Sequence, residues 1–275
     1  MLETYVKERI DILLVNLGYF SDIKESISNV MAGNVIVNNV KINKAGTFVN
    51  TDKEINVYIK GKKEKYVSRG GYKLEKAIKK FNLDFNNAIV LDIGASTGGF
   101  THCALEHGAA YVYAVDVGTN QLHWDLRNNP KVKSLENTHI NDLSLDMINN
   151  EKLDFITVDV SFISIKNIID SIKKLMSENT KLIMLIKPQF EAAKENVEKG
   201  GIVKNNNIHE LLIHDIMLVC EKLGIYGENI DFSPIRGFKG NIEYISLFSL
   251  NLIDKKNINI SEVVSSAEIL GGKND

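Results

Sequence analysis

The sequence predicts an α/β protein in which a doubly wound, mainly parallel sheet follows a small N-terminal α+β domain. Between about residues 88 and 248, apolar strands alternate with helical segments, which is typical of a parallel sheet covered by helices on both faces. Residues 1–60 instead combine two short helices with a few strands. The length of 275 residues suits one ordinary domain and a small one. We expect domains at 1–60 and 70–275, joined by a basic linker at 61–69.

The N-terminal domain is expected to begin with two helices. Apolar side chains recur on one helical face from Tyr5 to Leu17, and Gly18 follows as a C-terminal cap. Ser21 is placed to cap a second helix that ends before Gly33. The asparagines at 38 and 39 predict a tight hairpin within residues 34–42, because asparagine tolerates positive φ. A further strand is expected over residues 53–59.

The second domain is expected to hold strands at residues 88–92, 111–116, 153–159, 181–186 and 244–248. One helix is expected to run from a glycine-rich turn to about residue 107. A second should follow the strand at 153–159 and end at about residue 176, and a third should cover residues 208–223. The tail from about residue 252 is polar, with a short helical stretch near 261–269.

Charge is distributed unevenly along the chain, although the net charge is only −2. Residues 1–80 contain 15 Lys and Arg against 9 Asp and Glu, which gives +6 for this part and leaves −8 for the rest. This asymmetry favours an anionic partner for the N-terminal part, although a solvated basic face gives the same pattern. The charge peaks over residues 60–69, where Tyr66 lies among basic residues, as on a surface that binds phosphates and stacks on a base.

Composition disfavours several other classes of protein. The apolar run at 181–186 is too short to span a bilayer, and the first residues lack the apolar stretch of a signal peptide. Cys103 and Cys220 form no CxxC motif, and the six histidines show no ligand spacing. We therefore expect a cytoplasmic protein without a metal site.

A glycine-rich turn follows the first strand of the second domain, in Leu91-Asp-Ile-Gly-Ala-Ser-Thr-Gly-Gly-Phe100. Glycines let the backbone turn tightly and approach a ligand closely. Asp116 ends the next strand 22 residues after Gly94, which suits a carboxylate that accepts the ribose hydroxyls of an adenosine. The residues expected to contact a cofactor are Asp92, Gly94, Ser96, Gly98, Gly99, Phe100 and Asp116.

Two details favour S-adenosylmethionine over a dinucleotide as this cofactor. The turn begins with Asp92, whose carboxylate favours an amino group or a sulfonium and disfavours a pyrophosphate. The spacing is D-x-G-x-x-x-G-G and not the dinucleotide motif G-x-G-x-x-G. A purely structural turn and a dinucleotide site remain the alternatives.

Two charged residues lie at the ends of buried parallel strands. The carboxyl ends of these strands should meet at the same end of the sheet. Asp159 ends the strand at 153–159, and Lys187 directly follows the apolar run at 181–186. Because open α/β sheets react at the carboxyl ends of their strands, both should face the crevice beside the glycine-rich turn. A ribose 2′-hydroxyl needs a base, and a lysine can serve when burial and nearby positive charge lower its pKa. The simpler alternative is a lysine that reaches from a strand end to solvent.

The whole chain resembles the hemolysin A (TlyA) family of rRNA 2′-O-methyltransferases, and its second domain resembles the FtsJ-type enzymes. The resemblance covers about residues 5–248. Its specific stretches are Ser68-Arg-Gly-Gly-Tyr-Lys-Leu74, Leu91-Asp-Ile-Gly-Ala-Ser-Thr-Gly-Gly-Phe-Thr101, Val158-Asp-Val-Ser-Phe-Ile-Ser164, Ile186-Lys-Pro-Gln-Phe-Glu191 and Gly240-Asn-Ile-Glu-Tyr244. It implies a Rossmann-like S-adenosylmethionine-dependent methyltransferase fold after an S4-like RNA-binding domain.

The same resemblance implies a catalytic tetrad of Lys73, Asp159, Lys187 and Glu243. Lys187 would be the base, and the other three would orient it and the hydroxyl. The implied substrate is a cytidine ribose in the RNA of the small ribosomal subunit, the large subunit or both.

The S4-like domain implies a set of residues that face RNA. Glu8-Arg-Ile-Asp-Ile-Leu13 matches the opening helix motif, and Lys24 stands where S4 helices often carry arginine. Lysine keeps the charge but loses the bidentate phosphate fork, so contact there is expected to be weaker. The residues expected to face RNA are Arg9, Lys24, Lys41, Lys44, Lys62, Lys63, Lys65 and Arg69.

Three other functions compete with this interpretation. An S4-linked RNA modifier such as a pseudouridine synthase would leave the glycine-rich turn and Asp116 without a use. A secreted membrane-lytic protein, which the family's historical name suggests, is disfavoured because the sequence has no signal peptide and no strongly amphipathic basic helix. A non-catalytic ribosome-binding factor is disfavoured because all four tetrad positions are filled.

Overall fold

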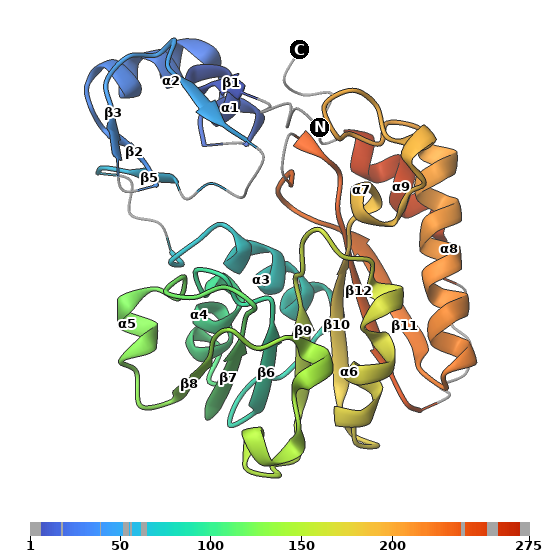
Figure 1. The fold of residues 1–275 in the computed structure, drawn as a ribbon. Helices are drawn as coiled ribbons and strands as arrows, with labels where there is room; N and C mark the ends of the chain where they lie inside the picture. Colours follow the sequence, from blue (N-terminus) through green and yellow to red (C-terminus); the bar gives the residue numbers. More distant parts are fainter. Residues whose placement is uncertain are drawn as a thin grey trace.

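The computed structural model describes residues 7–17, 19–38, 40–51, 55, 57–61, 65–237, 240–251 and 258–269. Its larger part is a seven-stranded sheet in the order β11-β12-β10-β9-β6-β7-β8 (Figure 1). The strands are β6 (Ile89–Ile93), β7 (Tyr111–Val115), β8 (Val132–Leu135), β9 (Phe155–Val158), β10 (Lys181–Ile186), β11 (Tyr226–Phe232) and β12 (Tyr244–Ser249). Strands from β10 to β8 are mutually parallel, and β12 runs antiparallel to both of its neighbours. The predicted doubly wound α/β fold is confirmed.

The direction of chain growth reverses in the middle of this sheet. After β6 the chain adds β7 and β8 on one side, and it then returns to add β9 and β10 on the other side. The loops that follow the adjacent strands β6 and β9 therefore lead in opposite directions. Doubly wound folds bind their ligands in the crevice at such a switch point, at the carboxyl ends of the strands.

Helices cover both faces of the sheet. On one face lie α3 (Gly70–Phe81) and α4 (Gly99–Glu106), and on the other lie α6 (Ile169–Leu175), α8 (Asn206–Lys222) and α9 (Ile260–Ile269). The short helices are α5 (Trp124–Arg127) and α7 (Pro188–Glu191), with 3₁₀ turns at 140–142, 145–148, 165–167 and 194–196. Adjacent strand residues serve opposite faces, as Val90 belongs to the core under α3 and Leu91 to the core under α6.

A smaller unit with its own core precedes the sheet (Figure 1). Its helices are α1 (Ile10–Asn16) and α2 (Ile23–Met31), and its strands are β1 (Lys7–Arg9), β2 (Val35–Val37), β3 (Val40–Ile42), β4 (Phe48–Asn50) and β5 (Val57–Ile59). β3, β2 and β5 form an antiparallel sheet, and β1 pairs with β4. This is the predicted α+β architecture. The domain limits at residues 60 and 70 stay predictions.

The first two helices differ in detail from the prediction. Lys7–Arg9 form a strand, so the first helix starts only at Ile10, and the expected cap Gly18 lies outside the described residues. The second helix is capped by Asp22, whose Oδ1 accepts the backbone N–H groups of Lys24 and Glu25 at 2.8 and 2.9 Å. The prediction that Ser21 is the cap was therefore wrong.

The elements of the larger part that were not predicted include α3, β8 and β11. β8 and β11 are the two edge strands of the sheet, and most of their side chains are only partly buried. They therefore lack the continuous apolar run that identifies a central strand. α3 begins with two glycines and is rich in lysine, although Leu74, Ala77, Ile78 and Phe81 follow the helical period.

Among the described residues, no helix is long and apolar enough to cross a membrane. Nor does the described part of the chain gather three or more His, Cys, Asp or Glu side chains in a group that could hold a metal ion.

Candidate active site

Four charged side chains meet at the carboxyl ends of the sheet. Asp159 follows β9, Lys187 follows β10, Lys73 lies in the first turn of α3, and Glu243 precedes β12. Asp159 Oδ1 is 2.6 Å from Lys187 Nζ, and Asp159 Oδ2 is 3.2 Å from Lys73 Nζ. Lys73 Nζ is also 2.8 Å from Glu243 Oε2. The structure thus brings together all four residues of the predicted tetrad.

The tetrad is largely shielded from water. Lys73, Lys187 and Glu243 expose only 8%, 7% and 2% of their surface. Burial by itself would raise the pKa of Asp159, but the ammonium groups of Lys187 and Lys73 outweigh this effect and hold the pKa below its usual value. Asp159 is therefore ionised at neutral pH and anchors both amines.

Two uncharged residues complete this network, and neither was predicted. Lys187 Nζ donates to Ser161 Oγ at 3.0 Å, and Gln189 Nε2 donates to Glu243 Oε1 at 3.4 Å. Each lies two residues from a tetrad member in the sequence, Ser161 from Asp159 and Gln189 from Lys187. That proximity was the available signal for them.

Glu191 fastens the loop after β9 to the loop after β10. Its carboxylate accepts the Ser164 hydroxyl at 2.5 Å and the backbone N–H of Ile165 at 2.8 Å. The rings of Phe162 and Phe190, one from each loop, lie 5.0 Å apart. Asp159 and Lys187 are therefore held in a fixed relation by contacts outside the tetrad.

The glycine-rich turn lies directly against the loop of Asp159. Gly94 has φ +79°, and a Cβ there would lie 2.7 Å from the Asp159 carbonyl oxygen. Gly98 has φ +96°, and a Cβ there would lie 2.3 Å from Leu126 Cδ1. Both positions require glycine, because the backbone is left-handed and no room exists for a side chain. The turn therefore approaches the tetrad as closely as the backbone allows.

Asp116 is positioned as the predicted ribose ligand would be. Its Oδ2 accepts the backbone N–H of Ser96 and its Oδ1 accepts that of Gly118, each at 2.7 Å. Because a carboxylate oxygen has two lone pairs, each oxygen can still accept one hydroxyl. The half-buried carboxylate and the glycine turn therefore fit the adenosine and methionine parts of S-adenosylmethionine.

Asp92, one of the residues expected to contact a cofactor, is buried beneath the glycine-rich turn. It is only 1% exposed, and its two oxygens accept the hydroxyls of Thr101 at 2.7 Å and Thr157 at 2.9 Å. Burial raises the pKa of Asp92 to about 6. Asp92 therefore braces the turn from beneath by joining β6 to α4 and β9, and direct contact with a cofactor is not what this geometry favours.

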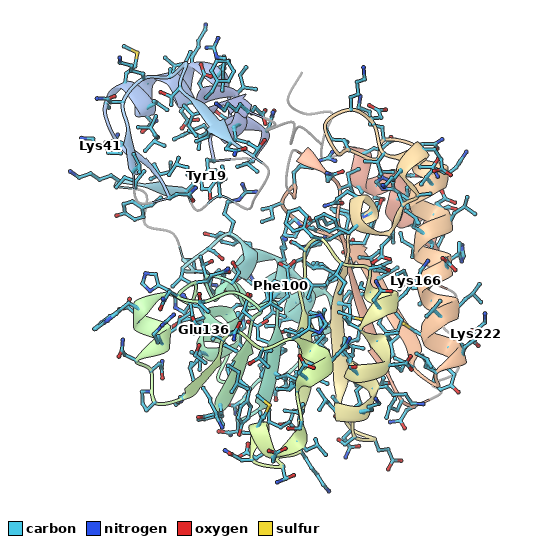
Figure 2. All side chains as sticks on the ribbon, viewed as in Figure 1. Tyr19, Lys41, Phe100, Glu136, Lys166 and Lys222 are labelled. Carbon is cyan, nitrogen blue, oxygen red and sulfur yellow. The ribbon has the colours of Figure 1, made fainter. Side chains whose placement is uncertain are left out.

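Phe100 and Gly99, which were also expected to contact the cofactor, pack closely against neighbouring parts of the protein. Phe100 is 4% exposed and packs in the core between α3, α4 and the sheet (Figure 2). A Cβ on Gly99 would lie 2.3 Å from Ser68 Oγ and 2.9 Å from the backbone nitrogen of Gly71. Gly99 therefore lets the start of α4 touch the start of α3, which carries Lys73. Both residues therefore hold the starts of α3 and α4 in place beside the site.

Of the basic residues expected to face RNA, Lys24, Lys41 and Lys44 are exposed on the smaller unit (Lys41 is labelled in Figure 2). Arg9 instead binds the buried carboxylate of Asp11 through two hydrogen bonds of 3.1 and 2.6 Å. Its side chain is nevertheless 45% exposed, so Arg9 combines this ion pair with a position at the surface.

The linker residues of the same set also have protein partners. Lys65 Nζ lies 2.7 Å from Glu75. The Arg69 guanidinium lies 4.8 Å from the ring centre of Tyr19 and donates to the Arg236 carbonyl at 3.2 Å. Lys62 and Lys63 lie outside the described residues.

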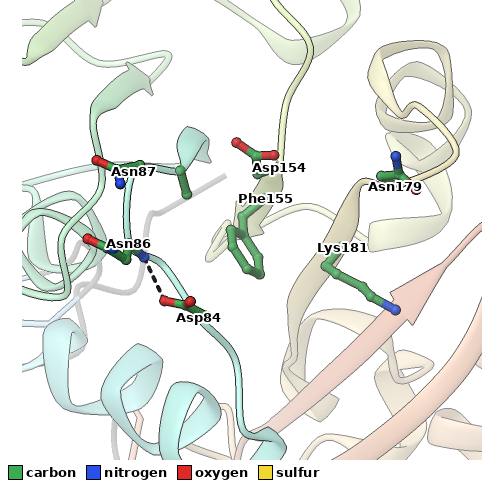
Figure 3. Close-up of a pocket in the computed structure, with 8 residues that line it drawn as sticks. Asp84, Asn86, Asn87, Asp154, Phe155, Asn179 and Lys181 are labelled. Atoms are coloured by element: carbon green, nitrogen blue, oxygen red, sulfur yellow. Dashed lines mark hydrogen bonds between the residues drawn. The ribbon is translucent and has the colours of Figure 1, made fainter.

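A further pocket lies at the amino ends of the central parallel strands, opposite to the end that carries the tetrad (Figure 3). Its lining includes Asn86, Asp154 and Lys181, which stand where β6, β9 and β10 begin. Since doubly wound folds react at the carboxyl ends of their strands, this pocket does not belong to the candidate active site.

The doubly wound sheet, the glycine-rich turn with Asp116, and the Lys-Asp-Lys-Glu cluster define a class, the S-adenosylmethionine-dependent methyltransferases. Residues 66–250 match the model of the family described as FtsJ-like methyltransferase. The chain belongs to the FtsJ-like methyltransferase family. This membership confirms the prediction of an enzyme that uses S-adenosylmethionine.

Relatives extend the similarity to the smaller unit. "Hemolysin A" of Brachyspira hyodysenteriae is 43% identical over 87% of this chain and 99% of the relative. "16S/23S rRNA (cytidine-2'-O)-methyltransferase TlyA" of Mycobacterium tuberculosis is 33% identical over 86% of this chain and 88% of the relative. A solved structure of a Streptococcus thermophilus protein with a provisional hemolysin name covers 98% of each chain, with 38% identity and a TM-score of 0.81. The resemblance to the hemolysin A (TlyA) family is confirmed.

Proposed function

We propose that this enzyme methylates the 2′-hydroxyl of a cytidine ribose in ribosomal RNA of the small subunit, the large subunit or both. The observation that carries the proposal is the contact network of Lys73, Asp159, Lys187 and Glu243 beside the glycine-rich turn. The Mycobacterium tuberculosis relative, whose name specifies this reaction, supports the choice of cytidine and of ribosomal RNA. Action on ribosomal subunits in the cytoplasm follows from that substrate.

In this proposal Lys187 is the base: in its neutral amine form it takes up the proton of the 2′-hydroxyl. Lys73 is held by two carboxylates, whereas Lys187 is held by Asp159 and the neutral hydroxyl of Ser161. Lys73 is thus the more firmly fixed cation, and we assign the role of base to Lys187. Asp159 and Glu243 orient the two amines, so the hydroxyl is bound in one orientation toward the turn.

The cofactor would lie along the glycine-rich turn. Gly94 and Gly98 let the turn pack against Asp159 and Leu126 in a left-handed conformation, and Asp116 accepts ribose hydroxyls. When bound there, S-adenosylmethionine supplies the methyl group. Asp92, Gly99 and Phe100 hold the turn in place from beneath.

The smaller unit, residues 1–60, acts as an S4-like RNA-binding domain in this proposal, joined by the linker 61–69 to the methyltransferase domain at 70–275. The exposed side chains of Lys24, Lys41 and Lys44 supply phosphate contacts. Arg9 and Lys65 are exposed as well and can add phosphate contacts while paired with Asp11 and Glu75, and Arg69 joins Tyr19 to the loop of Arg236.

The proposal is tested by transfer of labelled methyl from S-adenosylmethionine to ribosomal subunits that lack their modifications. Lys187→Ala should lower the rate constant at least about a hundredfold, because general-base catalysis contributes that much or more. Lys187→Arg keeps the charge beside Asp159 but cannot release its proton, so it should be equally inactive. An active Lys187→Arg variant would remove Lys187 as the base. No transfer by a wild-type protein that binds the cofactor would overturn the proposed function.

A further inference from the structure

An arginine that the sequence did not single out lines a cavity together with one tetrad residue, Glu243. Arg236 belongs to the loop between β11 and β12, seven residues before Glu243. The cavity, of about 200 Å³, is lined by the end of α1, by Arg69, by residues 232–236 and by Glu243. It therefore borders the smaller unit and reaches the tetrad at Glu243.

Neighbouring lysines pair with acidic side chains, but Arg236 has no acidic side chain beside it among the described residues. Lys76 Nζ lies 3.3 Å from Asp231, and Lys73 Nζ lies 2.8 Å from Glu243. Among the described residues, no carboxylate lies within 4.0 Å of the half-buried Arg236 guanidinium. Burial accordingly lowers the pKa of Arg236, and Tyr244 and Glu268 offset this only in part. A buried cation without an acidic partner is costly, and binding of an anion would relieve that cost.

The surroundings of Arg236 favour an anion over a metal or a cationic ligand. Within the described lining of the cavity, the one acidic side chain is Glu243, whose carboxylate already contacts Lys73 and Gln189. Arg69 donates to the Arg236 carbonyl at 3.2 Å and lies over the Tyr19 ring. The loop of Arg236 is therefore fastened to the unit that we expect to bind RNA.

We propose that Arg236 binds a phosphate of the RNA strand next to the ribose that is methylated. This inference rests on the proposed function. In RNA the 2′-hydroxyl is adjacent to the 3′-phosphate, so a ribose at the tetrad brings a phosphate to its immediate surroundings. The planar guanidinium presents two parallel N–H groups that match the oxygens of a phosphate. The carboxylate of the cofactor is a poorer candidate, because no residue of the glycine-rich turn lines this cavity.

Arg236→Ala, Arg236→Lys and the wild type should be compared in methyl transfer to unmodified ribosomal subunits at several salt concentrations. Lys222→Ala is the matched control, since it removes one exposed positive charge at the far end of α8 (Figure 2). S-adenosylmethionine affinity and melting temperature are measured for each variant. Arg236→Lys keeps the charge, so the test can rely on this variant if Arg236→Ala does not fold.

The expected result is a KM for the subunits that rises about tenfold in Arg236→Ala and less in Arg236→Lys, with cofactor affinity unchanged. The slope of log KM against log salt concentration should fall by about one for Arg236→Ala and stay constant for Lys222→Ala. If the wild type is active but Arg236→Ala matches Lys222→Ala in KM and slope, the inference is wrong and the proposed function stands. Weaker cofactor binding with unchanged KM for RNA would also overturn it. An inactive wild type would remove both proposals.

Discussion

Asp92 lies within β6 and Asp159 directly follows the adjacent strand β9, yet their environments shift the pKa values of the two carboxyls in opposite directions. Asp159 is surrounded by two ammonium groups, which lower its pKa despite burial. Asp92 has only the hydroxyls of Thr101 and Thr157, so burial dominates and raises its pKa to about 6. Asp159 therefore orients the two lysines, whereas Asp92 holds the neighbouring strand and helix in place.

This difference predicts a pH-dependent effect of Asp92→Asn on stability. Because the folded-state pKa of Asp92 is raised, its contribution to stability is complete below pH about 4 and is lost as the pH rises through about 6. The free energy of unfolding of Asp92→Asn minus that of the wild type should therefore increase by roughly 3 kcal/mol between pH 4 and pH 7. Urea denaturation at several pH values measures it. The exposed Asp142→Asn serves as control, and a difference that falls with rising pH would contradict the assignment.

The Glu191 carboxylate predicts a second effect at the residue scale. Glu191→Ala removes the acceptor of the Ser164 hydroxyl and of the Ile165 N–H, so the loops after β9 and β10 lose a common anchor. The methyl-transfer rate constant should fall about tenfold or more, because small displacements of reacting groups are expensive. Glu191→Gln keeps one acceptor oxygen and should recover part of the rate. Equal rates for wild type and Glu191→Ala, from single-turnover kinetics, would show that the loops are held without it.

At the scale of elements, the position of α3 depends on contacts between glycines and the linker. A Cβ on Gly71 would lie 2.3 Å from Cγ of Tyr66, whose ring is buried. α3 carries Lys73 only two residues further on. The packing at the start of α3 therefore affects both the stability of the protein and the position of Lys73 in the tetrad.

Gly71→Ala should consequently destabilise the protein by about 1–3 kcal/mol, as overpacking of a buried site does. It should also lower methyl transfer by displacing Lys73. Gly46→Ala is the matched control, because a Cβ there would meet nothing within 4 Å. Thermal melting and transfer assays on both variants check the expectation. A fully stable and active Gly71→Ala variant would mean that Tyr66 moves aside at little cost.

The sequence predicts elements well where burial is complete on both faces. β6, β7, β9 and β10 are central strands with continuous apolar runs, and each was expected close to its observed position. The edge strands β8 and β11 were not expected, because half of their environment is solvent. Among the tetrad residues, Asp159 and Lys187 follow from their places at strand ends. Lys73 lies on a helix among other lysines, so only the resemblance singled it out.

At the scale of the whole molecule, residues 1–80 carry a net charge of +6 and the rest of the chain −8. Residues 1–60 hold seven Lys and Arg against seven Asp and Glu, so the excess positive charge lies in residues 61–80, and long-range attraction of RNA should act mainly through that segment. The roles of Arg236 and Ser161 could not be predicted from the sequence. They depend on residues that are distant in the sequence and meet only in the folded chain.

The combined replacement Lys24→Ala, Lys41→Ala and Lys44→Ala tests the phosphate contacts proposed for the smaller unit. Affinity for ribosomal RNA should fall, and the slope of log affinity against log salt concentration should decrease by about two to three. Cofactor affinity and melting temperature should stay unchanged, because all three side chains are exposed and distant from the turn. An unchanged salt slope would place the RNA-binding surface elsewhere.

The central claim is that the tetrad directs a methyl group to a ribose oxygen. The most direct measurement is mass spectrometry of nucleosides from ribosomal RNA that has been incubated with S-adenosylmethionine and either the wild type or Lys187→Arg. The account predicts 2′-O-methylcytidine with the wild type and none with the variant. A methyl group on a base, or 2′-O-methylcytidine formed equally by Lys187→Arg, would contradict it.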